Sequence, residues 1–481
     1  MARPRQIACT PTRPVLRRAR WAGALLVALL AGRLATATVD AAEREPRGRI
    51  HVTYWEKWVG PEEAATRAVV EAFNRSQDRI TVEYFVQNPV DRKTIVAAAG
   101  GDPPDVAGLW IQNIASFADA EALTPLDDFI RRDGMTVEQW LSRYYPVYAR
   151  MVQHGGHVYA GISTPATIAL HWNKTLFREA GLDPERPPRT IQELDEFARR
   201  LTKRDPKTGE LLQVGFLPQE PGWWPWIFCR WFGGRLFDGD KITLATDPRN
   251  VAAMEWVASY TRALGRDAVT SFASGFAGQW ASPQSGFFSG KVAMIFQGVW
   301  FNNYIRQYKP GLDYGVAPAW PAAVPGIEDF AMAEADMLVI PRGAKHPEAA
   351  WEFVKYMNSA NPRAQSREEL QGMELLCFLQ EKNSALREWS PYFAGHHPHP
   401  RIDVFRRLSA SPHAEFVPDM GIWTEYEREV LAAFAEVRLL MAPPQQALEQ
   451  AQARLQKSWD RHFRSLARHG QPLPPSTGAT P

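Results

Sequence analysis

A strand–helix–strand pattern that begins near residue 50 places the tightest limit on what this chain can fold into. Ile50–Tyr54 alternates apolar and polar side chains, which is typical of a half-buried strand. Pro61 then marks the start of a helix whose apolar face includes Phe73, because proline is favoured at the first helical position. Ile80–Val86 is the next expected strand. Two strands joined through a helix pair in parallel with a right-handed crossover, so the sequence predicts an α/β fold.

The residues before this pattern have the features of a secretory signal peptide. Residues 1–20 contain six arginines and no acid, Ala22–Leu30 is apolar, and small side chains follow up to Ala42. The apolar run is too short to favour a membrane-spanning helix, although an uncleaved N-terminal anchor is the alternative. Residues 1–42 carry seven arginines and one aspartate, so the rest of the chain has a net charge of −4 where the whole chain has +2. We therefore expect a secreted protein that does not bind nucleic acid, since nucleic-acid binders have strongly basic domains.

Further helix and strand signals follow along the chain. Thr190–Glu193 is a capping box, in which the threonine hydroxyl and the glutamate carboxylate each satisfy a free backbone amide at a helix start. Met337–Ile340 is a short apolar strand, and Pro347 starts another helix. Residues 424–466 are expected to be helical, with one break at two prolines. Residues 469–481 contain prolines and small polar residues, as disordered tails do.

The familiar motifs of enzymes and metal sites are missing from the sequence. It contains no H-E-x-x-H, G-x-S-x-G or paired C-x-x-C motif, so we predict a non-enzymatic protein without a cofactor or metal. The run His396–His399 offers metal ligands, but a metal-binding histidine usually needs a third ligand and supporting partners. A disulfide is chemically allowed outside the cytoplasm. Nothing in the sequence brings Cys229 and Cys377 together, however, and we expect two buried thiols.

Tryptophan is the residue type that says most about function. The chain has 18 tryptophans, and several are clustered, as at Trp55 and Trp58 or in residues 219–226 around Trp223 and Trp224. The second segment has neither helical nor strand periodicity, so a core position does not explain it. Flat aromatic rings beside carboxylates suit sugars, because sugar C–H faces stack on the rings while the acids accept hydrogen bonds from the hydroxyls. We therefore predict a ligand cleft built from part of this set, with the other tryptophans in the core.

Several separate motifs, spread over about residues 50–460, resemble a single family. They are Tyr54–Trp55 with the helix that closes on Phe73–Asn74, Ala98–Val106, Leu123–Asp127, Tyr159–Ile162, Leu170–Phe177, Phe288–Met294, Gly298–Trp300, Ile340–Ala350 and Ala447–Gln452. Together they are similar to the sugar-binding, maltose-binding-protein-like class of extracellular solute-binding proteins, which supply ABC importers. Lipoproteins of this family carry a cysteine directly after the apolar core of the signal. This chain has none there, which favours a soluble periplasmic protein.

The resemblance implies a two-lobed periplasmic-binding-protein fold of type II, with the ligand in a cleft between lobes that are joined by hinge crossings. The expected lobes are residues 43–165 with 337–400 (lobe I) and residues 166–336 with 412–468 (lobe II). The crossings are expected near Pro165–Leu170, Ala333–Met337 and His397–Pro412.

The resemblance also implies which residues face the cleft and what they bind. The expected stacking rings and hydrogen-bonding acids are Trp55, Glu56, Asp105, Trp110, Glu220, Trp223, Trp224, Trp300, Asp336 and Trp423. A protein of this kind captures a mono- to oligosaccharide and delivers it to the membrane permease of an ABC importer. We expect a monomer that closes by population shift, since a ligand that contacts both lobes binds the closed form better.

Two other functions stay open on the sequence. A secreted carbohydrate-active enzyme also has a tryptophan-lined cleft, but it needs two carboxylates roughly 5–10 Å apart across the scissile bond. The second is a receptor of the same fold for a polyol, a glycerophosphodiester or a betaine. A betaine fits because aromatic rings attract quaternary ammonium groups. A phosphorylated ligand needs basic side chains, for which Lys57 and Arg230 are the nearby candidates. The unusual segment Gln371–Arg407 leaves the identity of the sugar open.

Overall fold

The computed structural model of the protein describes residues 48–468, and from Ile50 onward they belong to one compact unit. The predicted signal peptide (residues 1–42) and the predicted tail (469–481) lie outside the described residues. The strands are β1 (Ile50–Glu56), β2 (Ile80–Val86), β3 (Val106–Trp110), β4 (Gln153–His154), β5 (His157–Val158), β6 (Ala160–Asn173), β7 (Lys203–Arg204), β8 (Leu211–Phe216), β9 (Phe237–Asp238), β10 (Lys241–Ile242), β11 (Val292–Gly298), β12 (Tyr314–Val316), β13 (Ala331–Val339) and β14 (Ala414–Glu415).

Helices separate most of these strands along the chain. They are α2 (Pro61–Ser76), α3 (Val90–Gly100), α4 (Ile114–Asp119), α5 (Asp127–Arg132), α6 (Val137–Ser142), α7 (Pro146–Met151), α8 (Lys174–Glu179), α9 (Ile191–Leu201), α10 (Pro225–Trp231), α11 (Pro248–Leu264), α12 (Arg266–Ser274), α13 (Phe301–Tyr308), α14 (Pro347–Met357), α15 (Gly372–Gln380), α16 (Pro391–His396), α17 (Ile402–Ala410), α18 (Trp423–Arg438) and α19 (Pro444–Arg468), with short 3-10 turns at Ile111–Asn113 and Arg367–Glu369. Among the described residues, no helix is both long and apolar enough to cross a lipid bilayer.

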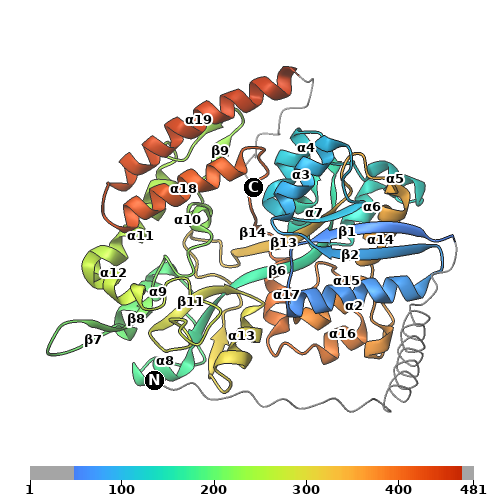
Figure 1. Cartoon of the computed structure of the whole chain (residues 1–481). Helices are drawn as coiled ribbons and strands as arrows, with labels where there is room; N and C mark the ends of the chain where they lie inside the picture. The colour runs from blue at the N-terminus through green and yellow to red at the C-terminus, as the bar shows by residue number, and fades with distance from the viewer. Residues whose placement is uncertain (1–47, 469–481) are drawn as a thin grey trace, which may run out of the picture. The chain divides into compact units, whose positions relative to one another are not determined.

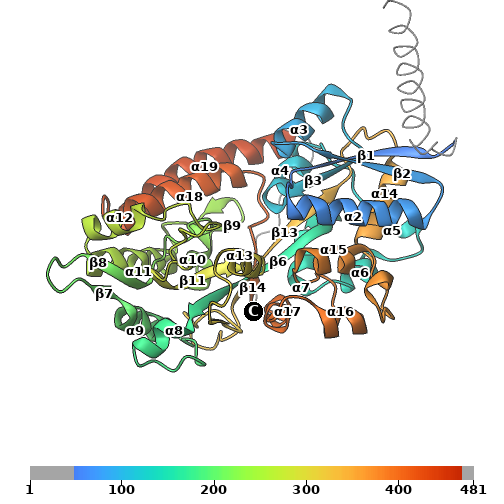
Figure 2. The same ribbon diagram turned by 60° about the horizontal axis from the view of Figure 1, so that its bottom comes forward.

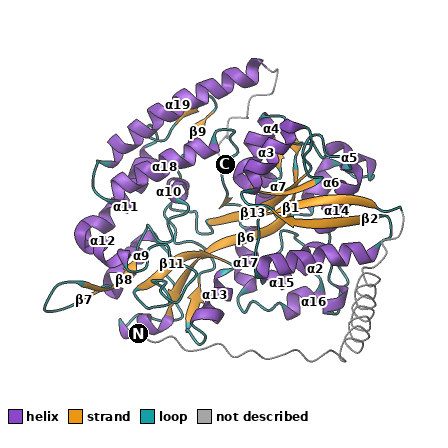
Figure 3. Cartoon of the chain, in the orientation of Figure 1, coloured by secondary structure: helices purple, strands orange, loops and turns teal. Residues whose placement is uncertain are grey.

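Ten strands form one mixed sheet that helices flank on both sides (Figures 1 and 3). Eight of them follow the order β2–β1–β3–β13–β6–β11–β8–β7, while β12 pairs with β6 and β14 with β13. The strand–helix–strand prediction is confirmed, since β1 and β2 run parallel with Ile50 opposite Ile80 and are joined through α2. β1 is also parallel to β3. The carboxyl ends of these three strands therefore meet at one edge of the sheet.

Two long strands connect the two ends of this sheet. All 14 residues of β6 are buried. Its first part, from Ala160 to Ile168, pairs with β13 from Val339 back to Met332, and its last part pairs with β11 and β12. β13 also pairs with β3, through Asp336–Val339. The strand predicted at Met337–Ile340 is thus only the end of a longer one that begins at Ala331. The first two expected crossings lie within β6 and β13, and the third segment contains α17, which packs against both strands.

The helix predictions hold with one correction. α2 begins at Pro61 and buries Phe73, α14 begins at Pro347, and a proline break separates the adjacent helices α18 and α19. At the start of α9, the Thr190 hydroxyl accepts a hydrogen bond from the Glu193 amide at 3.2 Å. The Glu193 carboxylate, however, accepts from the amide of Arg189 and not from that of Thr190, so half of the predicted capping box was wrong. Figure 2 shows α2 beside α15.

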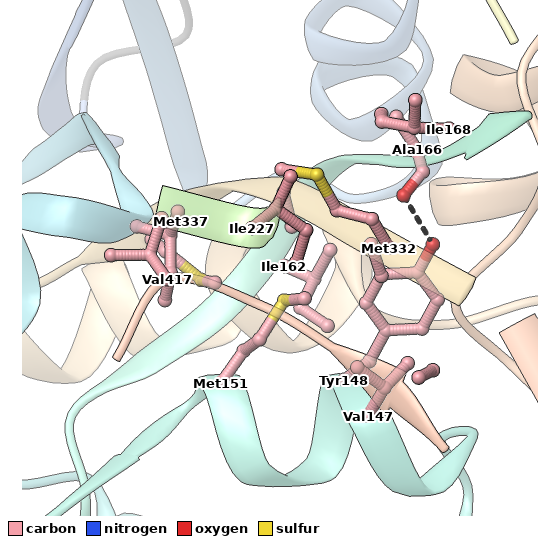
Figure 4. Close-up of a cluster of buried hydrophobic side chains, with 14 of the residues drawn as sticks. Val147, Tyr148, Met151, Ile162, Ala166, Ile168, Ile227, Met332, Met337 and Val417 are labelled. Carbon is pink, nitrogen blue, oxygen red and sulfur yellow. Dashed lines mark hydrogen bonds between the residues drawn. The ribbon is translucent and has the colours of Figure 1, made fainter. Parts of the chain in front are cut away.

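A cluster of buried apolar side chains packs against β6 and β13 (Figure 4). Side chains of α7 pack there against β6 and β13, and the Tyr148 hydroxyl donates a hydrogen bond to the Ala166 carbonyl at 2.9 Å. This bond satisfies a polar atom in the middle of the core, where leaving it unpaired is costly. Cys229 and Cys377 are both buried and free, as predicted. The core therefore fixes β6 and β13, and with them the residues that these strands carry.

Candidate functional site

The carboxyl ends of β1 and β3 bring three of the predicted residues together. β1 ends at Glu56 and β3 ends at Trp110, whose side chain is 37% exposed. Asp336 of β13 is the register partner of Trp110. In open α/β sheets, ligands bind outside the carboxyl ends of parallel strands. Glu56, Trp110 and Asp336 therefore lie where this fold places ligands.

A buried lysine connects these residues. The Nζ atom of Lys57 lies 3.0 Å from Glu56 Oε1, 3.1 Å from Asp336 Oδ1 and 4.3 Å from the centre of the Trp110 ring. Trp58 Nε1 donates to the other Asp336 oxygen at 3.0 Å. The Trp58 and Trp110 rings meet edge to face with centres 5.4 Å apart. We call Glu56, Lys57, Trp58, Trp110 and Asp336 the Lys57 cluster.

The charges of the Lys57 cluster compensate one another. Burial raises the pKa of the Glu56 carboxyl, while the neighbouring Lys57 lowers it. Burial disfavours the Lys57 ammonium, but Asp336 and Glu56 outweigh this effect, and the pKa of Lys57 is raised. The hydroxyl of Tyr54 donates to Glu56 Oε2 at 2.7 Å. Because each charged group has a close partner, the two indole rings are held in place by a polar framework.

A second aromatic group comes from the tryptophan-rich segment and from residues near α13. We call Trp223, Trp224, Trp280, Trp300 and Tyr304, all partly exposed, the tryptophan cluster. Trp223 meets Trp224 and Trp280 edge to face, with ring centres 5.1 and 4.8 Å apart, and Trp280 meets Tyr304 at 4.9 Å. Trp300 lies about equally far from Trp223 and Trp224, at 6.5 and 6.4 Å. Its Nε1 is buried and has no hydrogen-bond partner in the described part of the chain.

Glu334 of β13 links the two clusters. Its carboxylate accepts a hydrogen bond from Trp224 Nε1. Burial raises its pKa to about 8; the charge of Asp336 adds to this rise, while the Trp224 bond and Lys382 oppose it. At pH 7 Glu334 is therefore mostly protonated and can donate a hydrogen bond as well as accept one.

Glu220 lines a pocket formed by the tryptophan-rich segment itself. Trp223, Trp224 and Phe434 line the same pocket, together with other mostly apolar residues. Burial raises the pKa of Glu220 to about 7, and the charge of Arg438 on α18 opposes this. Glu220 thus shares its pocket with the two tryptophans, and its charged neighbour comes from α18.

The structure separates the other three predicted residues from both clusters. Asp105 accepts hydrogen bonds from the amides of Thr53 and His346, so it ties β1 to the start of α14. Trp423 is only 1% exposed and packs between Trp226 and Tyr426, which leaves no ring face for a ligand. Trp55 lies on the opposite face of β1 from Glu56, because side chains alternate along a strand. The expectation is therefore corrected for Asp105 and Trp423, whereas for Trp55, which is partly exposed, it stays a prediction.

Several residues in or beside the two clusters were not among the predicted site residues. Trp58 and Lys57 directly follow Glu56 in the sequence, and Glu334 precedes Asp336 by two positions, so adjacency was an available signal. Lys382 comes from the loop after α15 and places its Nζ 5.3 Å from the centre of the Trp58 ring. No local pattern pointed to it. Lys57 and Arg230 were thus an incomplete list of basic candidates, and Arg230 is paired with Glu415 at 2.6 Å.

The histidine run is used within the fold. His397 Nδ1 accepts from the His399 amide, and His399 Nδ1 accepts from the Arg401 amide. Across residues 48–468, no three His, Cys, Asp or Glu side chains are grouped so that they could hold a metal ion.

Comparison with known proteins places the chain in a family. The model of the family described as bacterial extracellular solute-binding protein matches residues 58–363. The maltotriose-binding protein of Pyrococcus abyssi is 25% identical over 283 residues, which are 58% of this chain and 56% of that protein. The sn-glycerol-3-phosphate-binding periplasmic protein of Escherichia coli K12 is 28% identical over 162 residues, or 31% of this chain and 34% of that protein. The matches thus span about a third to a half of the length of these relatives.

Solved structures extend the likeness to most of the fold. CpMnBP1 with mannotriose bound matches with a TM-score of 0.69 and 25% identity, over 84% of this chain and 99% of that one. The cyclic α-maltosyl-1,6-maltose binding protein of Arthrobacter globiformis matches with a TM-score of 0.65 and 20% identity, over 86% and 100%. The predicted fold class, a two-lobed α/β fold of the maltose-binding-protein type, is confirmed. This chain is a member of the bacterial extracellular solute-binding protein family.

Proposed function

We propose that this protein is the receptor of an ABC importer and that it captures a carbohydrate between its two lobes. The observation that carries the proposal is the pairing of partly exposed indole rings with carboxyl groups that β13 holds in place, Trp58 with Asp336 and Trp224 with Glu334. Indole faces stack on the C–H faces of a sugar ring, and carboxylates accept hydrogen bonds from its hydroxyls. The relative named for maltotriose and the neighbour solved with mannotriose support a sugar ligand.

In this proposal each cluster binds one side of the sugar. The Lys57 cluster presents Trp58 and Trp110 from residues 43–165 with 337–400, the expected lobe I. The tryptophan cluster presents Trp223, Trp224 and Trp300 from residues 166–336 with 412–468, the expected lobe II. A ligand that contacts both clusters binds the closed arrangement better than the open one and so shifts the population toward it. The closed receptor then docks on a membrane permease outside the cytoplasmic membrane, as a monomer.

The proposal includes no chemical step. A glycoside hydrolase needs one carboxylic acid and one free carboxylate on either side of the bond it cleaves. Glu56 and Asp336 share the same lysine and are each bound by a second donor, so neither is a free base. Incubation of the purified protein with the ligand it binds, followed by chromatography of the sugar, is expected to recover the sugar unchanged. If the wild type cleaves the sugar and a Glu334→Gln variant does not, the protein is an enzyme and the receptor proposal is refuted.

Thermal unfolding in the presence of candidate ligands tests the receptor function. A ligand at about 100 times its dissociation constant stabilises the folded state by roughly 2.7 kcal/mol, which shifts the midpoint by a few degrees. We expect such a shift with malto- or manno-oligosaccharides or related sugars, and quenching or enhancement of tryptophan fluorescence with the same midpoint concentration. A shift with a betaine or a simple polyol alone would keep the family and refute the sugar ligand.

A further inference from the structure

Lys382 is a buried cation of the site without a carboxylate in contact. Lys382 is only 4% exposed, and within residues 48–468 no hydrogen bond or ion pair is formed by its Nζ. This atom lies 5.3 Å from the centre of the Trp58 ring. An ammonium group has three N–H donors, and a buried charge without a partner is costly. Something other than the protein is therefore expected to pair with it.

Asp336, one of the two carboxylates whose charges act on Lys382, is already engaged elsewhere. Asp336 binds Lys57 with one oxygen and Trp58 with the other, and Glu56 binds Lys57 and Tyr54 in the same way. The charges of Glu62 and Asp336 still act on Lys382 from beyond ion-pair distance. Burial outweighs both and, together with the charge of Lys57, lowers the pKa of Lys382. This is the behaviour of a cation that lacks a direct counter-ion.

The backbone around Lys382 is fixed, so its position is not that of a loose surface side chain. The preceding residue, Glu381, accepts hydrogen bonds from Asn302 and Arg306 of α13. The amide of Lys382 donates to the Cys377 carbonyl at 2.8 Å, and its own carbonyl lies 3.1 Å from His397 Nε2. The segment after α15 therefore holds the ammonium beside the Trp58 ring before any ligand arrives.

We propose that Lys382 is the subsite for an anionic group of the ligand, so that the receptor prefers a sugar bearing a carboxylate or a phosphate over its neutral counterpart. The inference rests on the proposed function, because it assigns a charge to the same ligand. A sugar hydroxyl would satisfy one N–H but leave the buried charge without a counter-ion, whereas an oxyanion supplies both. Glu334 is mostly protonated at pH 7, so it donates to such an anion where an ionised carboxylate would repel it.

Matched pairs of ligands test this preference by isothermal titration calorimetry on the purified protein. The pairs are a uronate disaccharide against the neutral disaccharide of the same linkage, glucose 6-phosphate against glucose, and sn-glycerol 3-phosphate against glycerol. We expect the acidic member of at least one pair to bind ten or more times as tightly as the neutral one, with an advantage that shrinks as salt is raised. The pair that shows the preference tells whether the anion is a carboxylate or a phosphate.

Variants of Lys382 assign the preference to this residue. Lys382→Met is expected to remove the advantage of the acidic ligand and to leave binding of the neutral one within about threefold, while Lys382→Arg keeps the advantage. Lys345→Met, which changes an exposed lysine, is the matched control and leaves both affinities unchanged. If Lys382→Met does not fold, Lys382→Gln takes its place, and the matched pairs on the wild type still decide whether the ligand is anionic.

Two results overturn the inference, and they differ in what they leave standing. Neutral sugars that bind as tightly as their acidic counterparts refute the anionic subsite and leave the sugar receptor intact. A complete lack of binding to sugars of either kind refutes the proposed function itself.

Discussion

The Lys57 cluster and the tryptophan cluster both present indole rings, but they hold them in different ways. In the Lys57 cluster, Trp58 is hydrogen-bonded to Asp336, and a buried lysine between two carboxylates fixes the surroundings. In the tryptophan cluster the rings pack on one another at nearly right angles, and Trp224 has the single carboxyl anchor. A framework of charges fixes the orientation of a bound ligand and discriminates between ligands, whereas packed rings mainly supply contact area.

This difference predicts that mutations in the two clusters have different effects on stability and binding. Damage to the polar framework leaves a charge unpaired in the interior, so it lowers folding stability as well as binding. Loss of one ring from the tryptophan cluster removes contact area at a partly exposed surface, so it lowers binding with little effect on the fold.

Lys57→Met is expected to have the largest effect. It leaves the Glu56 and Asp336 carboxylates buried without their cation, and removal of one partner of a buried ion pair costs about 3–5 kcal/mol of folding free energy. Urea unfolding followed by circular dichroism measures this loss. The matched control is Lys345→Met, whose pair with Asp102 is exposed to solvent and therefore contributes little to stability. Equal stabilities of the two variants would show that the ion pairs of the Lys57 cluster do not hold it together.

Trp223→Ala is expected to weaken ligand binding by about 2 kcal/mol, or roughly 30-fold, the size of effect found for aromatic hot spots. The midpoint of thermal unfolding should fall by only a few degrees, since the ring is partly exposed. Trp389→Ala, at a partly exposed tryptophan that packs on Phe393 outside both clusters, is the control and should leave affinity unchanged. An unaltered dissociation constant in Trp223→Ala would remove the tryptophan cluster from the binding site.

The pH dependence of stability tests the group that joins the clusters. Glu334 has a folded-state pKa of about 8, raised from 4.5, so the folded state binds a proton more tightly than the unfolded chain does. Its contribution to stability is therefore complete below about pH 4.5 and is lost as the pH rises through 8. The charged groups that act on it are Asp336, Glu427 and Lys382.

Glu334→Gln removes this titration. We expect the free energy of unfolding of the wild type to fall more between pH 5 and 8 than that of the variant, measured by urea unfolding at each pH. Parallel curves for the two proteins would mean that Glu334 is ionised throughout that range. The polar link between the clusters would then be a charged one.

The smallest effect is expected for Trp280→Ala. This ring packs on Trp223 and Tyr304 and contacts neither Trp224 nor Trp300, so in the proposed site it would meet only the outer units of a long ligand. Affinity for a trisaccharide should fall by about 1 kcal/mol or less, and affinity for a monosaccharide should not change. Equal losses for short and long ligands would place Trp280 at the centre of the site.

The local elements could be predicted from the sequence, whereas the composition of the site could be predicted only in part. β1, α2 and β2 follow from period-two alternation and a helix-starting proline, signals that act over a few residues. β13 was predicted too short because Glu334 and Asp336 interrupt its apolar run, and a buried carboxylate becomes tolerable only through distant partners such as Lys57 and Trp224.

Chain position alone was a poor guide to which acids and rings a ligand can reach. Asp105, which belongs to a family motif, and Trp423 were both expected to face the ligand. Asp105 instead ties β1 to the start of α14, and Trp423 fills the core. A motif records which residue stands at a position. Burial and hydrogen bonding, which depend on the packed neighbours, decide whether its polar atoms or ring faces remain available.

The sequence by itself determined the α/β class, the alternating elements and the presence of clustered tryptophans near acids, because these depend on periodicity, capping and composition. Only the tertiary structure decided that Lys57 lies between Glu56 and Asp336, 279 residues further along, and that Lys382 reaches the Trp58 ring. Such contacts form when the long strands β6 and β13 are buried together, and the cost of burying each charge then selects its partner.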